Sequence, residues 1–333
     1  MPEYDRLLCK PGEIIGKNYR VISMIGEGTF SNVYLCVDLQ NDVEIVIKVC
    51  RNKRSYVLAA EDEIKTIKYL NSLDQGQEFF VKYHSSFNYK KHICIVFEKL
   101  GPSLYDALKF NSFHPFYIFT VKGLMKQIIG AVNILHQNKI VHTDLKLENV
   151  LLKGGMINQK GNDIENSGNL QASVRLIDFS SIDSGDAWHH HLITTRHYRA
   201  PEVLMGLRWG YECDIWSLGC ILVELTTGRI EFDAFDPIDH LYLIQQMIGD
   251  IPIKMWKNST IRDLKAFAKD GFINPRYVDK KLYEETKRKP DLKQILKQYN
   301  PYLADLAELM LNPDPDKRPK TEFILKHKFF DEY

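Results

Sequence analysis

The sequence predicts an α+β fold, in which a small antiparallel β-sheet carrying one helix is followed by a larger, mainly α-helical part. Two observations lead to this prediction. Short β-branched and aromatic stretches bounded by Gly, Asn or Asp fill the first hundred residues, as is typical of strands. After residues 100–103 the apolar residues recur at helical spacing over long stretches. We expect a cleft between the two parts, which is where small-molecule sites tend to lie.

Each predicted element rests on its local pattern. Strands of the first part are predicted over residues 19–26, 32–39, 43–50 and 92–98. Between them, Ile64, Ile67 and Leu70 lie at helical spacing with charges on the other side, which predicts a single helix over 59–73. Helices of the second part are predicted over 119–136, 211–228 and 301–311. Residues 153–170 are rich in Gly and Asn and predict a surface insertion.

The overall composition argues against several classes of protein. The chain has 333 residues, enough for about two domains of typical size. Its formal net charge of +1 offers no basic field for nucleic acid, so no direct nucleic-acid binding is predicted. The six cysteines are scattered, which favours free thiols in a reducing compartment over a disulfide framework. The first ten residues do not form a signal peptide and no stretch suggests a membrane span, so we expect a soluble intracellular protein.

A glycine-rich stretch at residues 25–33 follows one predicted strand and leads into another. A plain hairpin turn would explain it equally well, and a dinucleotide-binding turn would instead lead into a helix. Lys48 lies in the middle of the next β-branched strand, where an ammonium is costly to bury without a partner. Glu63, on the single nearby helix, is the natural partner. A Lys held in this way can reach the phosphates of a nucleotide under the glycine-rich stretch.

Two stretches of the later sequence carry residues suited to phosphate chemistry. In HTDLKLEN (142–149), Asp144 can accept a proton from an attacking hydroxyl and Asn149 can offer an oxygen to a metal. In LIDFS (176–180), we expect Asp178 to end a short strand, and hard cations such as Mg²⁺ take oxygen ligands of this kind. Each stretch alone is ambiguous, because an Asp in a loop is usually a cap or turn residue.

Together with APE (200–202) and DIWSLG (214–219), these stretches occur in an order that resembles the eukaryotic protein kinase family over roughly residues 17–330. The resemblance implies the bilobal protein kinase fold. A short N-terminal extension over 1–16 would precede an N-lobe over 17–100 and a C-lobe over 101–333. It also implies transfer of the γ-phosphoryl group of ATP to Ser or Thr of protein substrates, with Mg²⁺ as cofactor.

The same resemblance implies which residues surround ATP. The glycine-rich loop would cover the nucleotide, Lys48 would hold the α- and β-phosphates, and Glu63 would orient Lys48. Phe97 would occupy the gatekeeper position, and the backbone at 98–100 would meet adenine above the floor residue Leu151. The implied nucleotide set is Ile25, Gly26, Glu27, Gly28, Val33, Val46, Lys48, Glu63, Phe97, Glu98, Leu100 and Leu151.

For the transfer step, the resemblance implies that Asp144 is the catalytic base and that Lys146 lies beside the transferred phosphate. Thr195 would lie against Asp144, and Lys48 would complete the catalytic set. The implied metal ligands are Asn149 and Asp178. Three further residues are implied to be structural. Asp214 would anchor the catalytic loop, and Glu202 and Arg318 would form a buried ion pair.

Within the family, the chain resembles the LAMMER (CLK-type) dual-specificity kinases of the CMGC group. This resemblance rests on TTRHYRAPE (194–202), on HTDLK, on ICIVFEKLGPSLYD (93–106) and on the long spacer between Asn149 and Asp178. The signature helix of that group is present in outline at 239–249, with two glutamines in place of its acidic–basic pair. A DYRK-like kinase is the alternative, but no Tyr-x-Tyr occurs between residues 178 and 202.

Several positions depart from the family pattern. Ser31 replaces the third glycine of the loop, Val46 a smaller residue, Leu147 a proline, and Ser180 the glycine after Asp178 and Phe179. None of these removes a charge that the chemistry needs, so we expect an active kinase. The competing hypothesis is a weak or inactive pseudokinase scaffold, and a nucleotide oxidoreductase is a distant third.

The resemblance further implies Arg/Ser-rich splicing factors as substrates, autophosphorylation on Tyr, and a nuclear or nucleocytoplasmic location. We also expect a monomer that does not associate with membranes. Glu224 could meet a substrate Arg. The His triplet at 189–191 could bind a metal, although a solvated triplet is the favoured interpretation, and the charged stretch 264–294 could be a docking surface or an ordinary solvated insertion.

Overall fold

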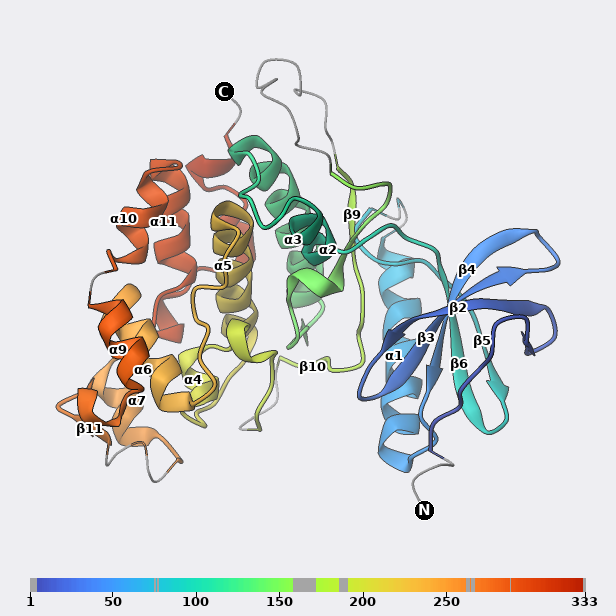
Figure 1. The fold of residues 1–333 in the computed structure, drawn as a ribbon, viewed down its shortest axis with the longest axis horizontal. Coiled ribbons are helices and arrows are strands. Elements are labelled where there is room, and N and C mark those ends of the chain that lie inside the picture. Colours follow the sequence, from blue (N-terminus) through green and yellow to red (C-terminus); the bar gives the residue numbers. More distant parts are fainter. Residues whose placement is uncertain are drawn as a thin grey trace. The chain divides into compact units, whose positions relative to one another are not determined.

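The computed structural model describes residues 5–74, 76, 78–157, 172–185, 191–261, 264, 267–287 and 289–331. The chain forms two compact units (Figure 1). The first unit consists of Met1–Gly101, Leu151–Gly155 and Val174–Ser181, and the second of Pro102–Val150, Met156–Ser173 and Ile182–Tyr333. The main segment of the first unit thus ends where the sequence pattern changes, at residues 100–103, and two later segments return to it.

The first unit is built on an antiparallel six-stranded sheet with the strand order β1-β2-β3-β4-β6-β5. Its strands are β1 (Ile14–Ile15), β2 (Tyr19–Glu27), β3 (Ser31–Asp38), β4 (Val43–Cys50), β5 (Tyr83–Tyr89) and β6 (His92–Glu98). The four predicted strands are confirmed. In the sequence of β5, YHSSFNY, Ser85 interrupts the alternation of aromatic residues, and the pairing with β6 is irregular between Tyr83 and Ser85, so the strand was not predicted.

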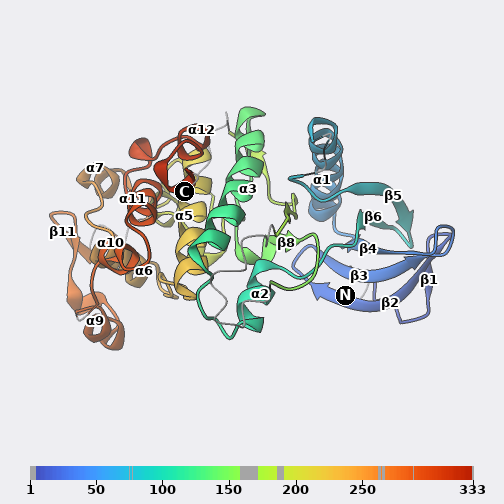
Figure 2. The ribbon, with the colours of Figure 1, turned by 90° about the horizontal axis from the view of Figure 1, so that it is seen from above.

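One helix, α1 (Arg54–Leu73), accompanies this sheet and is the helix predicted over residues 59–73. It contacts β4, β5 and β6, and both ribbon views show it beside these strands (Figures 1 and 2). The helix buries Ala60, Ile67 and Leu70 on the face that carries Glu63. A short strand, β9 (Val174–Leu176), joins the same unit through a bridge from Leu176 to Phe80.

The second unit is mainly helical, which confirms the α+β fold class. Its longer helices are α2 (Leu104–Phe110), α3 (Ile118–Gln137), α5 (Tyr211–Thr227), α6 (Pro237–Met247), α7 (Ile253–Asn258), α9 (Lys280–Thr286), α10 (Leu292–Lys297) and α11 (Pro301–Met310). Two single-turn helices are α4 (Pro201–Leu204) and α12 (Thr321–Ile324). The helix α5 is buried along nearly its whole length and packs against α3 and α11 (Figures 1 and 2). The three predicted helices are confirmed.

Short strands and single 3₁₀ turns complete the described chain. The strand pairs are β7 (Ile140–Val141) with β10 (Asp183–Ser184), β8 (Val150–Leu152) with β9, and β11 (Ala268–Lys269) with β12 (Phe272–Ile273). The 3₁₀ turns are Leu147–Asn149, Arg196–Tyr198, Pro275–Tyr277, Pro315–Lys317 and Lys328–Phe330. Most of the predicted insertion at 153–170 lies outside the described residues.

The helix α3 corrects the expectation that no stretch is long and apolar enough for a membrane span. Among the described residues, it is the single helix that meets that test by length and composition. Half of its apolar window is buried inside the protein, through residues such as Val121, Met125, Ile129 and Val132. A core helix passes the same test, because a helix that is apolar on most sides is covered by neighbouring helices.

All six cysteines are free and buried, as the scattered spacing predicted. Burial raises the pKa of the thiols of Cys36, Cys50 and Cys94, each to about 12. Cys9, Cys36 and Cys94 belong to the apolar core of the first unit, together with Tyr34, Ile47 and Val96. These thiols serve as small apolar core groups.

A substitution at Gly228, at the C-terminus of α5, would test how closely the second unit is packed there. Gly228 has φ +71°, and an added Cβ would lie 1.9 Å from the carbonyl oxygen of Phe113. We expect Gly228→Ala to lower the Tm by several degrees, since a left-handed residue with a Cβ costs about 1–2 kcal/mol before the clash is relieved. The matched control is Gly123→Ala on the exposed face of α3, where a Cβ meets nothing and should raise stability by about 0.5–1 kcal/mol. Equal effects of the two substitutions in thermal unfolding would contradict this account.

Candidate active site

The glycine-rich stretch forms the hairpin between β2 and β3. Gly26 pairs with Val33 and Glu27 with Asn32, and the Gly28 amide donates to the Ser31 carbonyl at 2.9 Å. An added Cβ at Gly26 or Gly28 would make only ordinary contacts, of 3.5 Å or more, with the rest of the hairpin. The hairpin itself therefore does not require these glycines. Their missing side chains leave room for a ligand to approach the backbone closely.

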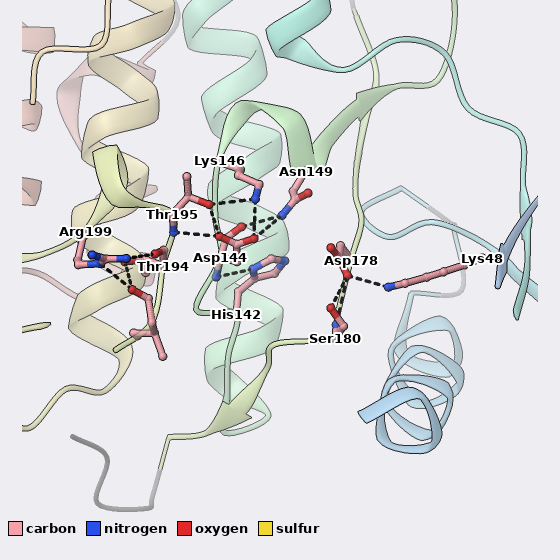
Figure 3. Close-up of polar contacts among 11 residues, drawn as sticks. Lys48, His142, Asp144, Lys146, Asn149, Asp178, Ser180, Thr194, Thr195 and Arg199 are labelled. Atoms are coloured by element: carbon pink, nitrogen blue, oxygen red, sulfur yellow. Dashed lines mark hydrogen bonds and ion pairs between the residues drawn. The ribbon is translucent and has the colours of Figure 1, made fainter. Parts of the chain in front are cut away.

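Lys48 lies at the centre of β4, between Val33 of β3 and Ile95 of β6. Its side chain is nearly buried, and Nζ donates to Glu63 Oε1 at 2.7 Å and to Oε2 at 2.8 Å. The predicted pairing of Lys48 with Glu63 is therefore present in the structure. A second carboxylate completes the arrangement, because Lys48 Nζ also lies 2.8 Å from Asp178 Oδ1 (Figure 3).

These charges stabilise one another inside the first unit. Burial alone lowers the pKa of the Lys48 ammonium, but attraction to Asp178 and Glu63 outweighs burial and raises that pKa. Glu63 is 2% exposed and also accepts a hydrogen bond from the backbone of Phe179. The two carboxylates therefore favour the charged form of Lys48.

Asp178 is held in an unusual backbone conformation, with φ +62°. Its carboxylate Oδ1 accepts hydrogen bonds from Lys48 and, at 2.7 Å, from the hydroxyl of Ser180 (Figure 3). Phe179 points into the core, where it meets Phe80 edge-on at 5.8 Å. A serine in place of the usual glycine thus bonds to the carboxylate two residues before it.

The residues predicted to meet adenine lie on neighbouring segments of the first unit. Val46 of β4 pairs with Phe97 of β6, and Phe97 is buried. The Glu98 carboxylate accepts from the Lys82 amide at 2.8 Å. After Leu100, the Gly101 amide donates to the Leu152 carbonyl at 2.7 Å. Leu151 lies on β8 directly before that carbonyl, so β8 and the segment at 98–101 are neighbours.

The predicted catalytic residues of the second unit form one hydrogen-bonded cluster (Figure 3). Asp144 Oδ1 accepts from the Thr195 hydroxyl at 2.7 Å and from its amide at 3.1 Å. Lys146 Nζ donates to Asp144 Oδ2 at 2.7 Å and to the Thr195 hydroxyl at 3.0 Å. The Asn149 amide group donates to the Asp144 carbonyl at 2.8 Å. Asp144 is therefore held from three directions by side chains that lie up to 51 positions away in sequence.

The loop that carries Asp144 is anchored by Asp214 of α5, as predicted. Asp214 is completely buried and accepts from the amides of His142 and Thr143 at 2.8 and 3.0 Å. Thr143 has φ +66°, which a β-branched residue adopts only when its surroundings impose it. The predicted ion pair is also present, with Arg318 donating to Glu202 at 2.6 and 2.8 Å.

Sequence reasoning missed His136, on the last turn of α3. Its Nε2 lies 2.9 Å from Asp214 Oδ2, so His136 supports the anchor of the loop. No motif contains this residue, and it lies 78 positions from its partner. Its position at the end of a long predicted helix was the only signal available.

The donor atoms suit a hard cation. Asp178 supplies carboxylate oxygens. The side-chain nitrogen of Asn149 donates to the Asp144 carbonyl, and the side-chain oxygen of Asn149 can serve as a ligand. Carboxylate and amide oxygens are the ligands that Mg²⁺ takes in phosphate-binding sites. The residues present therefore fit the magnesium ion that the kinase resemblance implies.

The other predicted features take no part in these clusters. Of the triplet at 189–191, His191 lies against Trp209 with ring centroids 5.1 Å apart, and the first two histidines lie outside the described residues. The described part of the stretch 264–294 forms β11, β12, a 3₁₀ turn, α9 and the start of α10.

Comparison with known proteins identifies the class. The protein kinase domain family matches residues 19–330. The chain therefore belongs to the protein kinase family. The crystal structure of the PF14_0431 kinase domain is similar with a TM-score of 0.86 and 31% identity, covering 99% of this chain and all of that chain. The bilobal kinase fold predicted from the sequence is confirmed.

The relatives also indicate the type of kinase. The serine/threonine-protein kinase AFC1 of Arabidopsis thaliana is 35% identical, over 96% of this chain and 72% of its own length. The dual specificity protein kinase CLK4 of Mus musculus is 35% identical, over 99% of this chain and 69% of its own length. These similarities confirm the predicted resemblance to the CLK-type kinases, and the protein is an ATP-dependent protein serine/threonine kinase.

The buried charges around Lys48 make the stability of the first unit depend on pH when Lys48 is removed. In Lys48→Met, Glu63 keeps its burial, which raises its carboxyl pKa, and loses the ammonium that opposes this rise. A carboxyl group whose pKa is higher in the folded than in the unfolded protein destabilises the folded state. The full cost applies at pH values above the folded-state pKa, and there is no cost below the unfolded-state pKa. We expect Lys48→Met to cost roughly 3–5 kcal/mol at pH 8 and clearly less at pH 5.

The measurement is the Tm difference between variant and wild type at each pH. The matched control is Lys48→Met combined with Glu63→Gln, which removes the titrating group and should make the difference independent of pH. A loss of Tm for Lys48→Met that is the same at pH 5 and pH 8 would show that Glu63 is not the cause.

Proposed function

We propose that this kinase transfers the γ-phosphoryl group of ATP to substrate hydroxyls with Asp144 as the catalytic base. The observation that carries the proposal is the cluster at Asp144, where Thr195 and Lys146 hold both carboxylate oxygens. A carboxylate fixed in this way can accept the proton of an attacking hydroxyl without first reorienting. Lys146 places a positive charge beside it, which would offset charge on the transferred phosphoryl group.

The first unit would bind the nucleotide. Lys48, whose charged form Glu63 and Asp178 favour, would hold the α- and β-phosphates, and Glu63 would orient Lys48. The hairpin residues Ile25–Val33 would cover the phosphates, while Val46, Phe97, Leu100 and Leu151 would surround adenine together with the backbone at Glu98. Asn149 and Asp178 would hold Mg²⁺, which supplies neutralising charge to the phosphates when bound.

The base assignment predicts a large loss of turnover in Asp144→Asn, which keeps the shape of the side chain and removes its basicity. We expect phosphate incorporation from labelled ATP and Mg²⁺ into a generic basic protein to fall by at least about a hundredfold. The matched control is Asp270→Asn, in the exposed turn between β11 and β12, where φ +53° suits Asn. It should retain wild-type activity. Equal incorporation by wild type and Asp144→Asn, or none by either, would favour the pseudokinase scaffold.

We further propose basic substrates, of the Arg/Ser-rich kind that the CLK resemblance suggests. Two carboxylates of the second unit support this, because Glu224 of α5 is buried and the exposed Glu148 adds like charge to it. Burial, opposed by a hydrogen bond from Tyr198 and reinforced by Glu148, raises the pKa of Glu224 to about 7. A substrate guanidinium would offset both the cost of ionising the buried Glu224 carboxyl and its repulsion by Glu148.

This proposal predicts that selectivity for Arg-flanked serine peptides over Ala-flanked ones increases between pH 6 and pH 8. The reason is that Glu224 becomes ionised as the pH rises through its pKa of about 7. We expect Glu224→Gln and Glu148→Gln each to raise KM for the Arg peptide about tenfold and to leave KM for ATP unchanged. Glu322→Gln, at an exposed site of α12, is the matched control. Unchanged selectivity in both test variants would refute the Arg site.

The remaining expectations stay proposals. The dual specificity in the names of the CLK relatives supports autophosphorylation on Tyr, which mass spectrometry of the purified kinase would detect. A nuclear or nucleocytoplasmic location rests on the family resemblance, and the absence of direct nucleic-acid binding on the near-zero net charge of the sequence. A monomeric state is proposed as well.

A further inference from the structure

A segment before the first strand lies along the outer edge of the glycine-rich hairpin in the first unit. The carbonyl of Asp5 accepts from the Asn52 amide at 3.0 Å. Two residues further on, the Leu7 carbonyl accepts from the Tyr34 hydroxyl at 3.2 Å, and that hydroxyl also accepts from the Cys9 amide. The segment is therefore fixed to β3 and to the end of β4.

Two arginines at this edge bond to the tip of the hairpin. Arg6 pairs with the carboxylate of Glu27, and its guanidinium donates to the Gly28 carbonyl at 3.2 Å. Arg51, directly after β4, donates from its guanidinium to the Thr29 carbonyl at 3.0 Å and from its amide to the Phe30 carbonyl at 2.9 Å. The consecutive carbonyls of Gly28, Thr29 and Phe30 thus each accept a hydrogen bond from Arg6 or Arg51.

The second arginine is itself held in place. Arg51 Nε donates to Asp5 Oδ2 at 2.9 Å, and a second nitrogen of the guanidinium contacts the same oxygen. The guanidinium lies 5.2 Å from the ring centroid of Tyr56, and Tyr56 meets Phe30 edge-on at 5.3 Å. Arg51 and Asp5 side chains are each 23% exposed, so the pair is partly desolvated.

Holding the carbonyls also orients the amides. The carbonyl and the N–H of one trans peptide point in opposite directions. Because the carbonyls of Gly28 and Thr29 point to the arginines, the amides of Thr29 and Phe30 point away from them. Successive backbone N–H groups in a turn form a concave site that attracts anions such as phosphate.

We propose that Arg6 and Arg51 are positioning residues for ATP, because they hold the hairpin tip so that the Thr29 and Phe30 amides face the phosphates. Asp5 would act through Arg51. The proposal rests on the nucleotide-binding role proposed above for the hairpin. It also accounts for the loop having only two of the family's three glycines. The hydrogen bonds from the two arginines fix the conformation of the tip, so the loop sequence alone need not determine it. The Arg6–Glu27 pair is exposed and adds little to stability, so the effect of Arg6 should appear in nucleotide binding.

The test compares ligands that differ only in their phosphates. Binding of adenosine and of ADP with Mg²⁺ is measured by calorimetry for wild type, Arg6→Ala, Arg51→Ala and the matched control Lys10→Ala. Lys10 is an exposed cation of the same segment whose side chain bonds to no tip residue. We expect the affinity for ADP to fall about three- to tenfold in each arginine variant, as the loss of one or two hydrogen bonds implies. The affinity for adenosine should not change, and Lys10→Ala should match wild type.

The outcomes separate this proposal from the function on which it rests. An adenosine affinity that falls by the same factor as the ADP affinity would reduce the arginines to structural residues. An ADP affinity unchanged in Arg6→Ala and Arg51→Ala would also overturn the proposal. A wild-type protein that binds neither ligand would overturn the nucleotide role of the hairpin itself. If Arg51→Ala fails to fold, Arg6→Ala decides, with Arg6→Lys expected to recover part of the ADP affinity.

Discussion

The structure of the first unit depends on one buried positive charge. Lys48 on β4 is stabilised only because Glu63 from α1 and Asp178 from the segment after β9 reach it together. An ammonium removed from water without such partners would cost several kcal/mol, so the helix, the sheet and the later segment must keep their positions for the charge to be tolerated. The same requirement places Lys48, which is suited to phosphate, within hydrogen-bonding distance of Asp178, whose carboxylate is suited to a metal.

The second unit uses the opposite charge in the same way. Asp214 is a buried carboxylate, and its cost is offset by two backbone amides and by His136. Satisfying Asp214 imposes the strained backbone at Thr143, and the loop that results presents Asp144 to Lys146 and Thr195. In both units a group that is expensive to bury determines the backbone that carries the chemistry.

The sequence predicted the features that follow from local residue patterns or from the need of a buried charge for a partner. Lys48 and Glu63 could be paired because a Lys inside a β-branched strand needs a carboxylate, and a single helix offered one. His136 could not be found, because its role depends on a contact 78 positions away. The contacts of Arg6 and Arg51 with the hairpin tip were missed for a similar reason. The guanidinium groups of Arg6 and Arg51 each reach the tip through a backbone carbonyl, and no residue pattern records which carbonyls a fold leaves available. The strand β5 was missed because Ser85, at an irregular point of the pairing, interrupts the alternation of its aromatic residues.

The buried cysteines have a consequence for how this kinase meets oxidising conditions. Oxidation begins from the thiolate, and both burial and the raised thiol pKa values keep that form scarce in the folded protein. Attack on Cys36 or Cys94 therefore requires the core of the first unit to open. Peroxide damage to the kinase would then follow the frequency of that opening, and the folded enzyme itself would not respond to redox state through these residues.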